Sequence, residues 1–243
     1  MASHDPDMRR AIISVLTGAA LVLPMQAQAQ DVDAAGAETP AVSVSYNAAI
    51  VSDYRFRGLS YTDRKPAVQG GADLSFRSGW FVGTWLSSLA NYGGSHVEVD
   101  LYGGYAGTIG NWSYSGTVLG YAYPGGRDTN YVELQSTLGH TIGPVSATLT
   151  MAYTPDQWNT DRDNLYTGLA TSIAILGTPL TASASVGREN GSYDEKWDWS
   201  AGLSCTIDKL QLSASYIDSN YKGALEAGRN GRATALLSVK AIF

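Results

Sequence analysis

Apolar and polar residues alternate with a period of two along most of the chain after residue 41. In the segment 145–154, the residues Val145, Ala147, Leu149, Met151 and Tyr153 alternate with Ser146, Thr148 and Thr150. This is the period of a β-strand with one apolar face and one polar face. The pattern predicts strands at residues 42–56, 66–77, 80–88, 96–109, 112–123, 130–142, 145–154, 164–176, 178–189, 197–207, 210–218 and 232–243. In 112–123 both faces mix small, apolar and tyrosine residues, so the pattern there does not separate inside from outside.

The connections between these segments alternate strictly between short and long. The short ones contain the turn-forming residues Gly, Pro, Asn or Asp, at 78–79, 110–111, 143–144, 177 and 208–209. The long ones are 57–65, 89–95, 124–129, 155–163, 190–196 and 219–231. Membrane barrels have short periplasmic turns and longer external loops, whereas a soluble sandwich has no reason to alternate in this way. We therefore expect an all-β fold, a closed antiparallel transmembrane β-barrel of about 12 strands.

The beginning of the chain has the pattern of a secretory signal peptide. A basic segment at 8–10 is followed by an apolar run at 11–23 and by the small-x-small cleavage site Ala27-Gln28-Ala29. Residues 1–7 resemble an extension upstream of the natural start. We expect 1–29 to be the signal peptide, 30–41 a disordered periplasmic tail and 42–243 the barrel.

The composition is mildly acidic, with 16 Lys and Arg against 22 Asp and Glu and a formal net charge of −6. Because there is no basic run, nucleic acid is not an expected partner. No apolar stretch after the leader reaches the roughly 18 residues that a membrane-spanning helix needs. The single cysteine, Cys205, has the parity of an apolar face and no activating base nearby, so we interpret it as a small hydrophobe that faces outer-membrane lipid.

The predicted strand ends carry many aromatic residues, as do the interfacial girdles of membrane barrels. We expect Phe76, Trp80, Trp112 and Phe243 at the periplasmic rim, and Tyr54, Phe56, Tyr153, Trp158, Trp197, Trp199 and Tyr216 at the outer rim. The last strand ends on Phe243. This ending resembles the C-terminal signature of bacterial outer-membrane barrels, and that resemblance implies recognition by the barrel-assembly machinery.

Four segments together carry a resemblance to a known family. They are 52–60 (SDYRFRGLS), 66–71 (PAVQGG), 83–85 (GTW) and 98–104 (EVDLYGG). In combination they resemble the TorF-like porin family of proteobacterial outer membranes, closely over residues 44–125 and more loosely to the end of the chain. The resemblance implies an outer-membrane barrel with no established substrate and no catalytic residues.

Charged residues with lumen parity gather on the first, second and fourth predicted strands. On the first of these strands Tyr54 and Phe56 take the lipid side. The candidates for the lumen and its constriction are Asp53, Arg55, Arg57, Asp73, Arg77, Glu98 and Asp100, and Glu133 and Lys240 join them from other strands. We rank Arg–carboxylate pairs that satisfy a narrow lumen ahead of a charged constriction that selects solutes; the two can coexist.

The sequence contains no pattern typical of an enzyme or of a cofactor site. The mature chain has two histidines, His96 and His140, and neither belongs to a Ser-His pair with a third orienting group. Two histidines and one cysteine do not make a zinc site, and Asp156, Asp161 and Asp163 lack the spacing of an EF-hand. We expect no catalytic, metal-binding or cofactor-binding residue, and no cofactor.

The sequence favours a porin-like channel of the Gram-negative outer membrane, through which small polar solutes diffuse passively. A structural or adhesive barrel without transport is the alternative, although the external loops are modest in length for a receptor. An outer-membrane barrel enzyme ranks third.

Overall fold

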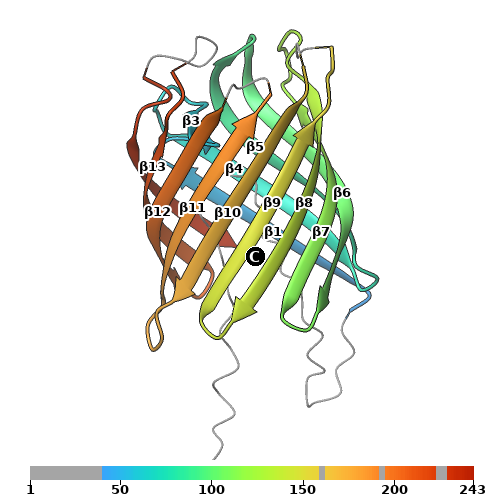
Figure 1. Cartoon of the computed structure of the whole chain (residues 1–243), viewed down its shortest axis with the longest axis vertical. Coiled ribbons are helices and arrows are strands. Elements are labelled where there is room, and N and C mark those ends of the chain that lie inside the picture. Colours follow the sequence, from blue (N-terminus) through green and yellow to red (C-terminus); the bar gives the residue numbers. More distant parts are fainter. Residues whose placement is uncertain (1–39, 159–161, 192–194, 223–228) are drawn as a thin grey trace, which may run out of the picture.

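The computed structural model describes residues 40–158, 162–191, 195–222 and 229–243, and shows one closed antiparallel barrel of twelve strands (Figure 1). The wall strands are β1 (Val42–Val51), β4 (Ala67–Phe76), β5 (Trp80–Tyr92), β6 (Ser95–Ile109), β7 (Trp112–Ala122), β8 (Tyr131–Ile142), β9 (Val145–Thr154), β10 (Asn164–Ala174), β11 (Leu180–Asn190), β12 (Lys196–Ile207), β13 (Leu210–Ser219) and β14 (Thr234–Ile242). Two short strands, β2 (Arg55–Phe56) and β3 (Leu59–Ser60), pair only with each other. The predicted barrel is confirmed. The predicted signal peptide at 1–29, and the tail up to residue 39, lie outside the described residues.

Each wall strand pairs with its neighbours in the chain, and β1 closes the ring by pairing with β14. The seam is continued by Phe243, whose backbone N–H donates to the carbonyl of Tyr46 at 2.8 Å and whose ring stacks on the Tyr46 ring. Within the described residues, no helix is long and apolar enough to span a membrane.

The outside of the wall carries a continuous apolar belt, because one face of every strand is apolar. Leu138, Leu149 and Leu169 are cross-strand neighbours on β8, β9 and β10, and all three are exposed. Further exposed residues of the belt include Leu101, Val118, Leu134, Leu203, Leu212 and Leu237. The inward positions of β9 hold Ser146 and Thr150, both buried. A transmembrane barrel presents such a belt to hydrocarbon and its polar face to the lumen.

The structure resolves the ambiguous face of β7. Gly116 and Val118 point outward and are exposed, whereas Thr117, Leu119 and Tyr121 point inward and are buried. The inside of the barrel is therefore apolar along part of this strand, which explains why its two faces could not be separated by polarity.

The two kinds of connection lie at opposite ends of the barrel, here named the short-turn end and the long-loop end (Figure 1). The predicted long loop 89–95 is wrong, because β5 and β6 continue past the wall to a tight turn at Gly93-Gly94. Both glycines have positive φ, 59° and 104°, which a tight hairpin turn requires and glycine adopts without a steric penalty.

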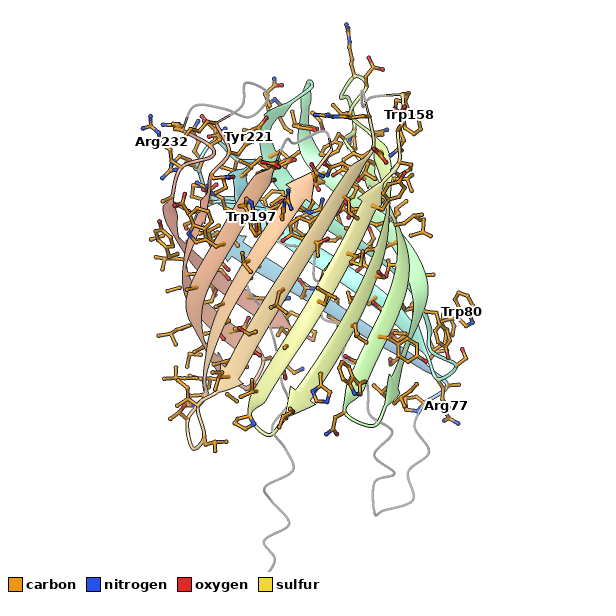
Figure 2. All side chains as sticks on the ribbon, in the orientation of Figure 1. Arg77, Trp80, Trp158, Trp197, Tyr221 and Arg232 are labelled. Carbon is orange, nitrogen blue, oxygen red and sulfur yellow. The ribbon has the colours of Figure 1, made fainter. Side chains whose placement is uncertain are left out.

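Aromatic side chains mark both ends of the barrel. Figure 2 shows Trp80 at the short-turn end, and Trp158 and Tyr221 at the long-loop end. Trp112 packs against His140 at 4.2 Å between ring centroids. The prediction that Tyr54 and Phe56 face lipid is wrong, since both are buried inside the barrel. The cause is that β1 ends at Val51 rather than at residue 56, and the chain then turns inward.

The facing of β9 gives a prediction for stability in a bilayer. Leu149→Arg places a charge in the middle of the apolar belt and should lower the free energy of unfolding by about 2–4 kcal/mol. Thr148→Arg, one residue away on the lumen face, is the matched control and should cost clearly less. Urea titration of the protein folded into lipid vesicles, followed by tryptophan fluorescence, measures both; equal losses would contradict the assigned facing.

Candidate functional site

The connection between β1 and β4, residues 52–66, folds into the lumen at the long-loop end; we call it the inner loop. All of its residues from 53 to 60 are buried. Its tip is a two-residue turn between β2 and β3, in which Arg57 has φ 47° and Gly58 has φ 83°. Two successive positive φ values are typical of the type I′ hairpin turn. A Cβ on Gly58 would lie 2.8 Å from Ser219 Cβ and 2.9 Å from Asp198 Cβ, so the tip packs closely against the wall.

The Arg57 guanidinium joins two wall strands across the lumen. Its Nη2 is 2.7 Å from Glu133 Oε2 on β8, and its Nη1 is 3.0 Å from Glu189 Oε1 on β11. Lys196 Nζ on β12 lies 2.5 Å from the other oxygen of Glu189. Burial disfavours the charge on Arg57, but the attraction of Glu133 and Glu189 outweighs burial, so the pKa of Arg57 is raised further above its ordinary value. The guanidinium at the tip therefore stays charged and binds both carboxylates.

A second arginine ties the inner loop to the seam of the barrel. Arg55 Nε is 2.6 Å from Asp53 Oδ2, and its Nη1 donates to the carbonyls of Gly58, Asn230 and Arg232, each at 2.9 Å. Asp53 in turn accepts hydrogen bonds from the hydroxyls of Ser60 and Thr62 within the loop. These bonds fix the base of the hairpin next to the beginning of β14.

Aromatic rings surround the tip on the side of β5 to β8. They form a closed circuit of neighbours in the order Tyr61, Phe56, Tyr121, Tyr131, Tyr123 and Tyr92, with centroid separations of 4.3–6.5 Å. Tyr54 joins the circuit through Tyr61 and packs on Trp85 at 5.4 Å. In the long-loop half of the lumen, aromatic rings therefore pack on the side of β5 to β8, and ion pairs reach across to β11 and β12.

The structure brings five of the seven predicted lumen residues together. Asp53, Arg55, Arg57, Glu98 and Asp100 are all buried in the long-loop half of the barrel. The first three lie on the inner loop rather than on a wall strand.

The other two predicted residues lie elsewhere. Asp73 faces the lumen further from the loops and accepts a hydrogen bond from the Tyr102 hydroxyl at 2.6 Å. Arg77 does not join the group, because β4 ends at Phe76 and Arg77 lies exposed in the turn at the short-turn end (Figure 2).

Three buried charged residues of the site are not among the predicted constriction residues: Glu189, Lys196 and Asp198, of which Asp198 has lumen parity on its predicted strand. Glu189 has lumen parity on its predicted strand, so the signal was present. Lys196 was assigned to a loop because it precedes the predicted strand by one residue. Among the described residues no group of three His, Cys, Asp or Glu is arranged to hold a metal ion, and Asp161 of the acidic loop lies outside them.

Comparison with known proteins agrees with this architecture. Residues 34–243 match the family described as "Bacterial protein of unknown function (Gcw_chp)". The chain belongs to the Gcw_chp family. No curated protein matches it.

Solved structures of low sequence identity share the fold of this Gcw_chp protein. The KdgM porin is 8% identical, with a TM-score of 0.56 over 82% of this chain and 97% of that one. The NanC porin is 10% identical, with a TM-score of 0.55 over 82% and 98%. An outer-membrane channel from Pseudomonas putida F1 is 12% identical, with a TM-score of 0.54 over 85% and 96%. At these identities the likeness establishes the barrel fold.

The buried network predicts a large stability effect at Arg57. Arg57→Gln leaves Glu133 without its cation and should lower the free energy of unfolding by about 3–5 kcal/mol. Arg188→Gln is the control, because Arg188 pairs with Glu195 at 3.3 Å but both side chains are exposed, and its loss should cost less than about 1 kcal/mol. Urea unfolding in micelles compares the two, and similar losses would mean that the network does not hold the loop.

Proposed function

We propose that this Gcw_chp protein is a porin-like channel of the Gram-negative outer membrane that lets small polar solutes diffuse passively. The observation that carries the proposal is a closed barrel with an apolar exterior and a lumen lined by small polar side chains. In the short-turn half these include Ser115, Thr137, Ser183 and Ser213, which are only half-buried. Such short side chains cannot meet across a twelve-stranded barrel, which lies between the filled barrels of about 8 strands and the open porins of about 16–18.

The inner loop is the narrowest part of the proposed passage. It enters from the long-loop end and occupies the lumen where Arg57 reaches Glu133 and Glu189. The charges there satisfy one another, as narrow lumens require, and the same charges meet any solute that passes. Selection by a charged constriction and structural filling are therefore two roles of one network.

The proposal extends to export and assembly. We include in the proposal that residues 1–29 direct export and that Phe243 is recognised by the barrel-assembly machinery. The relation to TorF-like porins, which rests on segments such as 52–60 and 98–104, belongs to the same proposal.

One observation favours a second candidate, a structural barrel without transport. The eight successive buried residues 53–60 obstruct the long-loop half of the lumen. A barrel closed in this way would conduct only if the inner loop moved.

Conductance in planar bilayers tests the proposal. Wild type should form channels of small conductance, and the double variant Arg55→Gln, Arg57→Gln should conduct more and shift towards cations, since it loosens the loop and frees the acids of the network. The exposed control Arg188→Gln should behave as wild type. If neither wild type nor the double variant conducts, and liposome swelling detects no solute entry, the channel proposal fails and the structural barrel is preferred.

A further inference from the structure

The buried charges of the lumen do not balance. Among the described residues three bases are buried, Arg55, Arg57 and Lys196, against six acids, Asp53, Glu98, Asp100, Glu133, Glu189 and Asp198. The bases pair with Asp53, Glu133 and Glu189. Lys196 and Arg57 also attract Asp198, so among the described residues Glu98 and Asp100 are the buried acids that remain without a base, and they lie next to each other on the inward face of β6.

Glu98 and Asp100 are 1% and 0% exposed. The Tyr54 hydroxyl donates to Glu98 Oε1 at 3.2 Å, while both carboxylate oxygens of Asp100 have no hydrogen-bond partner. Being two residues apart on one strand face, the carboxyl groups lie on neighbouring levels of the lumen wall. The next acid on their side, Glu133, already bonds to Arg57.

Two ionised carboxylates in so buried a place are strongly unfavourable unless a positive charge balances them or protons neutralise them. The surrounding groups suit a cation. The Tyr54 ring, whose hydroxyl donates to Glu98, packs against Trp85 and Tyr61, so aromatic rings border the acids, and aromatic rings attract cations. A divalent metal is a poor fit, because Ca²⁺ and Mg²⁺ need about six oxygen ligands and the described residues hold no cluster of three acids arranged around a metal.

The geometry points to a binding site for a small monovalent cation at Glu98 and Asp100, beside the inner loop. Its occupant neutralises the uncompensated acids, and the passage favours cations over anions. The consequence for transport rests on the proposed channel function, whereas the binding itself does not.

Ion selectivity tests the consequence for transport. Reversal potentials are measured across a KCl gradient for wild type, for the double variant Glu98→Gln, Asp100→Asn, and for Asp128→Asn, which removes an exposed acid from a loop at the long-loop end. Wild type should prefer K⁺ over Cl⁻ by about tenfold, the double variant should lose the preference, and the control should keep it. A conducting wild type without cation preference, or a double variant that keeps it, overturns the inference and leaves the channel proposal standing.

Thermal unfolding in micelles tests binding without requiring conduction. At equal ionic strength, KCl should raise the Tm of wild type by about 2–4 °C relative to the chloride of the bulky cation N-methylglucamine, and the double variant should lose this difference. Glutamine and asparagine imitate protonated acids. If the pair simply holds protons, neither K⁺ nor the substitutions change the Tm, and the inference fails. If K⁺ stabilises a protein that does not conduct, the binding site is supported and the channel proposal fails.

Discussion

A strand that crosses hydrocarbon must pair its backbone within the protein, and this requirement shapes the whole molecule. Around most of the wall, consecutive hairpins meet it. At the seam they do not. There β1 leaves the wall at Val51, which pairs with Ser238, whereas β14 already begins at Thr234, four residues earlier in the chain. Just before that stretch of β14, Arg55 and Arg64 of the inner loop donate to the carbonyls of Asn230, Arg232 and Ala233. The inner loop is thus part of the closure of the barrel as well as an obstacle within it.

The wall was predictable because its two environments force an alternation that can be read from the sequence. β9 is the clear case, with Leu149 outside and Thr150 inside, and its predicted bounds agree with the structure. The alternation weakens where the interior is not polar. Leu119 and Tyr121 of β7 face inward yet are apolar, because Phe56 of the inner loop packs there, with its ring 6.0 Å from that of Tyr121. For the same reason Tyr54 and Phe56 were wrongly assigned to the lipid side. Parity distinguishes a polar interior from lipid, but it does not distinguish lipid from an interior filled by an aromatic loop.

The charged site was predictable in composition and not in connectivity. Parity shows which residues of a strand share a face, so Glu98 and Asp100 could be placed inside. It does not show which strands lie opposite one another across a lumen. That Arg57 meets Glu133 and Glu189 depends on the length of the inner loop and on the type I′ turn that places its tip there. A positive φ at an arginine is not an expectation that sequence alone supports.

The position of the inner loop in the chain has a consequence for the order of assembly. Residues 52–66 precede eleven of the twelve wall strands, and the partners of Arg57 lie 76 and 132 residues further along the chain. The ion pairs of the loop tip therefore form only when these later strands are in place around it. Contacts of such long sequence separation form late and slowly. Pairing of the first strand with the last closes the barrel around a loop that comes near the beginning of the described chain.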